Sequence, residues 1–273
     1  MQNFSTSPHA MAQSLWANRS LIRVLVVREV VGRYRGSVFG ILWSFFNPVL
    51  MLAVYTFVFS VVFKARWGGG AAESKAEFAL VLFAGLLVFN LFAECVIRAP
   101  SLILSNVNYV KKVVFPLEIL PWVAFGAALF HAVVSFIVWV MFFIIIIGFP
   151  HPSVFLLPLV ILPLVLVIMG ISWFLAALGV FFRDVSQMVG VVVTILMFFT
   201  PIFYPLAAIP EAYRVFLFCN PLTFIVEQTR GLLIFGAFPR WGYLGLITSF
   251  SFLVAWFGFA WFQKTRKGFA DVL

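Results

Sequence analysis

Arginine has the clearest chemical potential in this sequence, and a group of arginines stands just before the first long apolar run. They are Arg19, Arg23, Arg28, Arg33 and Arg35, and no charged side chain occurs from Val38 to Phe63. A guanidinium presents a fixed fork of N–H donors that can bind two phosphate oxygens, whereas a lysine ammonium acts as a single point. Arg33 and Arg35, with Tyr34 between them, are therefore candidates for binding an anionic headgroup. The alternative is that these arginines only orient the chain, because basic residues mark the cytoplasmic side of membrane spans.

Two carboxylates, Glu94 and Glu118, are candidates for catalysis near a membrane face, but the sequence gives neither a convincing partner. Asn90, Glu94 and Arg98 recur every four residues and share one helical face, so Glu94 is predicted to pair with Arg98 one turn on. Glu94 also lies close to the end of its apolar run. A side chain that reaches out to the membrane interface explains it as well as a function does.

Further polar residues lie within apolar runs. His131, Ser135 and Trp139 recur every four residues, which favours interhelical hydrogen bonds over a pore lining. His9, His131 and His151 have no Cys, Asp or Glu at metal-ligand spacing, so no metal site is expected. Cys95 and Cys219 are too few for a disulfide framework and are expected to be free thiols.

The composition indicates a membrane protein that crosses the bilayer several times. The chain has 273 residues, of which 64% are hydrophobic and 10% charged, against about 25% charged in soluble domains. The net charge of +9 does not indicate nucleic-acid binding, because the basic residues stand at the ends of apolar runs and not in one stripe. Residues 1–13 lack the pattern of a cleaved signal peptide.

We predict an all-α protein with six transmembrane helices, because runs of about 20 apolar residues suffice to cross a membrane. The predicted spans are 38–63, 78–97, 121–147, 154–182, 185–203 and 243–262. Residues 13–36 are predicted to form an amphipathic helix on the cytoplasmic surface, with an unstructured basic flank as the alternative. Residues 99–116 are predicted to form a short cytoplasmic helical segment between two prolines.

Residues 206–241 are apolar enough for a seventh span, but Asn220-Pro221, Glu227 and Arg230 interrupt them. A re-entrant pair of half-helices on the outer face, hinged at Asn220-Pro221, accounts for these interruptions. It also keeps both termini in the cytoplasm, where most of the lysines and arginines then lie.

What the sequence lacks favours a conduit over an enzyme. No G-x-x-x-x-G-K-[ST] stretch is present, so the chain is not expected to bind a nucleoside triphosphate through a P-loop. The spans carry almost no ionisable residues that could relay protons or sodium, which argues against a secondary transporter. Energy for transport is therefore expected to come from a partner.

Several short motifs occur in a fixed order along most of the chain. They are Arg28-Glu29, Arg33-Tyr34-Arg35-Gly36-Ser37, Gly40, Trp43-Ser44-Phe45-Phe46-Asn47-Pro48, Asn108-Tyr109-Val110-Lys111-Lys112, Phe115-Pro116-Leu117-Glu118-Ile119-Leu120-Pro121, Arg183-Asp184-Val185, Thr200-Pro201-Ile202-Phe203-Tyr204-Pro205 and Asn220-Pro221-Leu222. Each fragment alone is weak, but this order and these separations are specific. On these residues the chain resembles the ABC-2 type membrane subunits of ABC transporters that export lipid-linked polysaccharides.

The resemblance implies a homodimer in the bacterial cytoplasmic membrane with two nucleotide-binding ATPase subunits beneath it. The ATPase would use ATP and Mg²⁺, and this chain would bind no cofactor itself. The segment around 101–114 would be a coupling helix docked in the ATPase, with contacts from Ser105, Asn106, Asn108, Lys111 and Lys112. The stretch after the fifth span would form periplasmic gate helices, with hinge residues Pro205, Asn220 and Pro221.

The implied substrate is an O-antigen, capsular polysaccharide or teichoic acid on a polyprenyl lipid, and the motifs do not encode which one. Arg33, Tyr34 and Arg35 would then form its cytoplasmic entrance, while Glu94 and Arg98 are the polar residues within the membrane. Aromatic residues make up 19% of the chain and can stack on sugar rings, although core and lipid-facing positions explain most of them. Two alternatives remain: a membrane enzyme acting on a lipid-linked sugar, and an exporter of drugs or small lipids on the same scaffold.

Overall fold

The computed structural model describes residues 5–58, 75–111, 115–218 and 220–273, and these residues form helices and connecting segments with no strand among them. The α-helices are α1 (Pro8–Ala17), α2 (Arg19–Tyr34), α3 (Trp43–Tyr55), α4 (Lys75–Arg98), α5 (Val107–Lys111), α6 (Leu120–Ile146), α7 (Leu157–Phe181), α8 (Val185–Phe199), α9 (Glu211–Phe218), α10 (Pro221–Leu233), α11 (Trp241–Thr265) and α12 (Phe269–Val272). Short 3-10 turns are η1 (Gly40–Leu42), η3 (Ala99–Ser101), η4 (Leu104–Asn106), η5 (Leu117–Ile119), η6 (Pro152–Leu156), η7 (Leu206–Ala208) and η8 (Arg266–Gly268). The all-α prediction is confirmed.

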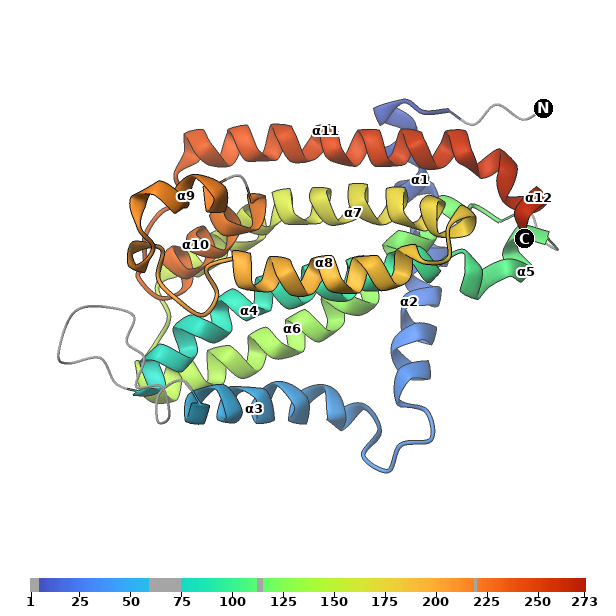
Figure 1. The fold of residues 1–273 in the computed structure, drawn as a ribbon. Helices are drawn as coiled ribbons and strands as arrows, with labels where there is room; N and C mark the ends of the chain where they lie inside the picture. The colour runs from blue at the N-terminus through green and yellow to red at the C-terminus, as the bar shows by residue number, and fades with distance from the viewer. Residues whose placement is uncertain (1–4, 59–74, 112–114, 219) are drawn as a thin grey trace.

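Several helical stretches have the length and composition to cross a membrane. They are Gly40–Val58, Ala76–Ser101, Leu117–Ile146, Pro152–Phe181 and Trp241–Val272, and α8 is apolar but shorter. These helices run side by side, and α2 lies across one end of the bundle (Figure 1). α5 and α12 lie at the end that α2 crosses, whereas α9 and α10 lie at the opposite end (Figure 1). The chain is therefore a multi-pass membrane protein.

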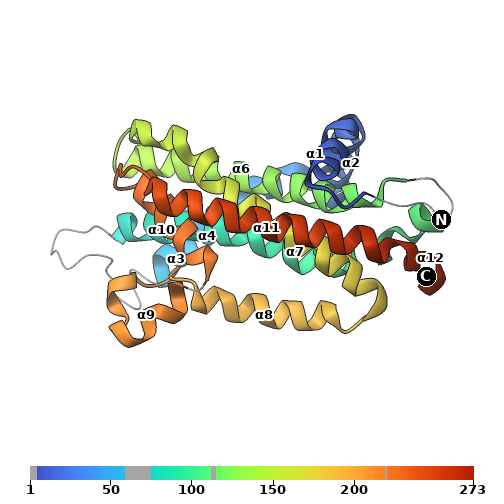
Figure 2. The ribbon, with the colours of Figure 1, turned by 90° about the horizontal axis from the view of Figure 1, so that it is seen from above.

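α4 occupies the centre of the bundle. It contacts α3, α6, α7, α8 and α10, and it lies between α6 and α8 when the molecule is seen from above (Figure 2). Of its most apolar stretch, 72% is buried, against 11% for the α3 stretch and 17% for the α6 stretch. Most of α4 is consequently covered by other helices, whereas most residues of α3 are exposed.

The helices agree closely with the predicted spans. Four of them, α4, α6, α7 and α11, coincide with the predictions within a few residues. The first predicted span contains η1 and α3, and residues 59–63 lie outside the described part of the chain. α8 ends at Phe199 because Thr200 precedes a proline and takes an extended conformation. That six helices cross the membrane, with a re-entrant pair after the fifth, stays a prediction.

The predicted amphipathic segment 13–36 is helical, but it is broken into α1 and α2. Asn18 ends the first helix and begins the second, and its side-chain amide donates to the Ser14 carbonyl at 2.8 Å. Both sides of α2 carry apolar side chains: Leu25 and Val30 are buried, whereas Val24, Val27 and Val31 are exposed. Its location in the membrane interface stays a prediction.

α7 and α11 approach so closely that their backbones touch at two glycines. A Cβ atom added at Gly258 would lie 2.0 Å from the Gly170 carbonyl oxygen, and one added at Gly170 would lie 2.4 Å from the Val254 carbonyl oxygen. Small residues allow such close packing of membrane helices. This contact fixes the two long helices against each other.

Candidate functional site

α2 carries its arginines onto the side of α4 and α6. Leu25 packs with Ile119 of η5 and Val123 of α6, together with other apolar side chains of α2. α2 ends at Tyr34, because Gly36 just beyond it has a positive φ of 85° that favours glycine. This packing lays α2 against α6, and from its last turn the Arg33 side chain reaches Glu94 on α4.

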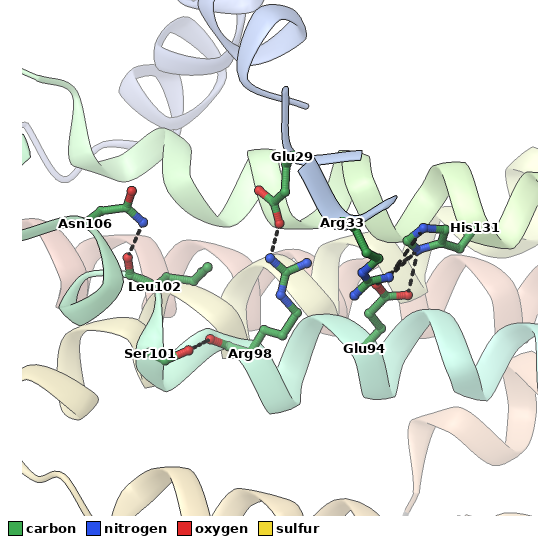
Figure 3. Close-up of polar contacts among 8 residues, drawn as sticks. All are labelled: Glu29, Arg33, Glu94, Arg98, Ser101, Leu102, Asn106 and His131. Carbon is green, nitrogen blue, oxygen red and sulfur yellow. Dashed lines mark hydrogen bonds and ion pairs between the residues drawn. The ribbon is translucent and has the colours of Figure 1, made fainter. Parts of the chain in front are cut away.

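Arg33, Glu94 and His131 form a charged cluster where these three helices meet (Figure 3). Arg33 Nη1 lies 2.7 Å from Glu94 Oε1 and 2.8 Å from His131 Nδ1. His131 Nδ1 lies 3.1 Å from the same Glu94 oxygen, and the Tyr34 hydroxyl lies 3.0 Å from His131 Nε2. Arg33 and Glu94 thus compensate each other's charge within the site.

One neutral tautomer of His131 satisfies its contacts with Glu94 and Tyr34, but not the approach of the Arg33 N–H to Nδ1. Nδ1 carries the proton and donates to Glu94, while Nε2 accepts a hydrogen bond from the Tyr34 hydroxyl. Burial raises the pKa of the Tyr34 phenol, so the hydroxyl stays protonated at neutral pH and remains a donor. Side chains from three helices thus hold the cluster together, and the charges of Arg33 and Glu94 oppose each other at its centre.

A cavity of about 440 Å³ lies beside this cluster, between α2, α3, α4 and α6. Besides the charged cluster, its walls carry aromatic and uncharged polar side chains, including Tyr34, Trp43, Ser44, Asn47, Asn90 and Ser135. Small-molecule sites have volumes of about 300–1,000 Å³ and combine apolar or aromatic walls with a few converging polar groups. The cavity has the size and lining to hold a hydrophilic group.

The predicted pair between Glu94 and Arg98 is wrong. Glu94 binds Arg33 and His131, while Arg98 Nη2 binds Glu29 Oε1 (Figure 3). An i,i+4 pair on one helix contributes only about 0.2–0.5 kcal/mol. Because α2 lies across α4, it offers both residues a partner of opposite charge from another helix.

Glu118 also has partners that the sequence did not reveal. Its Oε2 atom lies 2.6 Å from Arg266 Nη1, and the Ser14 hydroxyl lies 3.4 Å from its Oε1 atom. Arg266 Nη2 additionally donates to the Phe115 carbonyl at 2.8 Å. These contacts join α1, η5 and η8 where α2 crosses the bundle, so Glu118 has a structural role there.

The predicted coupling residues lie on η4 and α5. Ser105, Asn108 and Lys111 are exposed, while the Asn106 amide donates to the Leu102 carbonyl at 2.9 Å (Figure 3). Lys112 lies outside the described residues. The exposed side chains leave this end of the bundle open to contact with another protein.

Two hydrogen bonds attach α5 to distant parts of the chain. Arg28 of α2 donates through Nη2 to the Tyr109 hydroxyl at 2.9 Å. The Lys111 ammonium donates to the carbonyl oxygen of Leu273 at the end of the chain. A displacement of α5 would therefore act on α2, which carries Arg33 five residues beyond Arg28.

α10 begins at Pro221, where the sequence predicts an interruption. Asn220 caps α10, accepting from the Leu222 N–H at 3.0 Å, and its amide donates to the Thr200 hydroxyl at 2.9 Å. Pro221 occupies the first position of α10, where no N–H is needed. Pro205 lies in the segment between α8 and η7. A hinge role for these residues stays a prediction.

Arg230, which the sequence suggests is an outer charge, is only 1% exposed. Its guanidinium donates to the carbonyls of Val81 at 3.1 Å and Ile202 at 2.6 Å, and also to the Pro201 carbonyl. It pairs with Glu227 Oε1 at 3.1 Å. Arg230 thus attaches α10 to α4 and to the segment that follows α8.

Comparison with known proteins identifies the class of this bundle. Residues 20–234 match the family described as ABC-2 type transporter, so the chain belongs to this family of transporter membrane proteins. It is similar to the O-antigen export system permease protein RfbA of Myxococcus xanthus, with 29% identity over 263 residues that cover 96% of this chain and 98% of the relative. RfbA of Klebsiella pneumoniae is 28% identical, covering 93% and 95% of the two chains. The polysialic acid transport protein KpsM of Escherichia coli is 23% identical, covering 90% and 93%.

Proposed function

We propose that this chain is the transmembrane subunit of an ATP-driven exporter that moves lipid-linked polysaccharide across the inner membrane of a bacterium. Similarity over at least 90% of the chain to O-antigen and polysialic acid transport proteins carries this proposal. In the proposed assembly, two copies of the chain form the channel. Two partner ATPase subunits bind ATP and Mg²⁺ and hydrolyse the nucleotide, and this chain binds no cofactor.

Loss of the chain tests the proposed export directly. In cells that lack it, polyprenyl-linked glycan is expected to accumulate inside the membrane, and surface polysaccharide is expected to disappear until the gene is restored. Normal surface polysaccharide in these cells would contradict export. A glycan that reaches the surface with an altered structure would point instead to an enzyme.

The proposed orientation has both termini in the cytoplasm. α5 and α12 lie at the end that α2 crosses, and the arginine-rich α2 is expected on the cytoplasmic side, which supports this orientation. The ATPase would then dock on α5, where Ser105, Asn108 and Lys111 are exposed. α9 and α10 would face the periplasm as gate helices.

We also propose that Arg33, Tyr34 and Arg35 form the cytoplasmic entrance. Arg33 already pairs with Glu94, so the exposed Arg35 is the arginine best placed to meet an incoming diphosphate. Arg35→Lys keeps the charge that orients the chain but removes bidentate binding of phosphate oxygens. Export is expected to fall several-fold while membrane insertion is unchanged. Wild-type export by this variant would leave Arg35 with orientation alone.

A further inference from the structure

We propose that the cavity between α2, α3, α4 and α6 binds one uncharged sugar of the lipid-linked substrate, namely the pyranose that adjoins the lipid diphosphate. The proposal rests on the export function above and goes further, because it names the chemical group recognised and the residues that recognise it. Asn47, Asn90 and Ser135 would bind its hydroxyl groups, and Trp43 would stack on its ring.

The charge balance of the cavity favours an uncharged ligand. Arg33 and Glu94 lie 2.7 Å apart and neutralise each other. A diphosphate bound there would compete with Glu94 for Arg33. It would leave the carboxylate without its cationic partner, which is costly in a partly buried site. A ligand with hydroxyl groups imposes no such loss.

Three side chains of the cavity have hydrogen-bonding capacity that the protein does not use. Asn47, Asn90 and Ser135 line the cavity from α3, α4 and α6, and within the described chain their side chains make no hydrogen bond. They lie on helices long and apolar enough to cross a membrane, where unsatisfied polar groups are unfavourable. Amides and hydroxyls both donate and accept, as sugar hydroxyls do. The hydroxyl groups of a sugar can therefore both donate hydrogen bonds to these three side chains and accept them.

The aromatic wall adds a surface for the apolar face of a sugar ring. Trp43 lines the cavity and is 42% exposed. Edge contacts to Phe39 and Phe46, with ring centroids 5.6 and 6.5 Å away, hold the indole in place. A fixed and partly exposed aromatic ring offers a large contact area with little loss of side-chain entropy. The combination of indole and amides is suited to one pyranose.

The position of the cavity also fits the order of groups in the substrate. Tyr34 lines the cavity, and the exposed Arg35 follows it directly in the sequence. In a lipid-linked glycan the diphosphate is bonded to the first sugar. A sugar in the cavity would therefore leave its diphosphate at the end of α2, within the proposed entrance.

Equilibrium binding to the purified complex of this chain with its ATPase tests the proposal. Two radiolabelled probes are used: the lipid-linked glycan extracted from cells that lack the exporter, and polyprenyl diphosphate without sugar. Asn47→Leu and Asn90→Leu are each expected to weaken binding of the glycan lipid about tenfold, or about 1.4 kcal/mol. Binding of the sugar-free lipid should stay unchanged. Ser135→Ala, which removes a single oxygen, is expected to act in the same direction with a smaller effect.

Thr248→Val is the matched control. It removes a hydroxyl from α11, where Thr248 donates to the Leu244 carbonyl at 2.7 Å and lies away from the cavity. Its affinity for both probes should equal that of the wild type. Wild-type affinity for the glycan lipid in all three cavity variants would overturn the sugar site, and so would an equal loss for both probes. Failure of the wild-type complex to bind the glycan lipid would refute the export proposal itself.

Discussion

Replacing Arg230 with methionine tests whether α10 is held by the buried guanidinium. The change removes the donors to the carbonyls of Val81, Pro201 and Ile202. An unsatisfied buried acceptor costs about 1–3 kcal/mol. The Val81 carbonyl also belongs to α4, where helix geometry supplies an N–H. Three such acceptors sum to about 3–9 kcal/mol, and we expect a loss in the lower half of that range, about 3–6 kcal/mol.

Thermal unfolding in detergent measures this loss. For chains of 150–250 residues, 1 kcal/mol shifts the melting temperature by about 2–4 °C, so Arg230→Met should melt about 10 °C below the wild type. All variants are compared at one scan rate, because membrane proteins often unfold irreversibly. The exposed Arg240, just before α11, is the control, and Arg240→Met should shift melting by about 1 °C at most. Equal melting of the two variants would refute the reasoning.

Two further substitutions test helix contacts. Gly258→Ala would place a Cβ atom 2.0 Å from the Gly170 carbonyl oxygen and should destabilise the protein by about 2 kcal/mol or more. Gly245→Ala is the control on the same helix, because a Cβ atom added there would have no neighbouring atom within 4 Å. It should be neutral or stabilise the protein by up to about 1 kcal/mol. Similar melting temperatures for the two variants would contradict the close α7–α11 contact. Tyr109→Phe removes the acceptor of the 2.9 Å hydrogen bond from Arg28, so substrate-stimulated ATP hydrolysis by the complex should fall while melting is unchanged. Unaltered stimulation would exclude this hydrogen bond from coupling.

Features set by a single segment could be predicted from the sequence, whereas partners from distant segments could not. Apolar length alone predicts α4, α6, α7 and α11, and the Asn220-Pro221 pair predicts the start of α10. By contrast, Glu94 lies 37 residues from His131, and no local pattern indicates that α2 crosses both helices. The sequence therefore predicts the nearest partner, Arg98, and the structure contradicts that pair.

Arg230 shows the same limit in another form. Hydropathy treats a charged side chain as an interruption, since burying an unpaired charge is costly. Here the backbone carbonyls that follow α8 receive the guanidinium, and that segment turns back toward α10 only in the folded protein. The sequence shows that an arginine interrupts this apolar stretch, but the carbonyl groups that bind it are brought together only by the tertiary structure.

The central position of α4 has a consequence for how the chain tolerates mutation. Side chains on α3 are mostly exposed, so one large apolar residue can replace another there with little effect. On α4, with 72% of its span buried, a side chain must also match the shape of its neighbours, and volume changes of even one methylene are felt. Random mutagenesis scored for export should therefore accept exchanges among leucine, isoleucine and phenylalanine along α3 and reject most of them along α4.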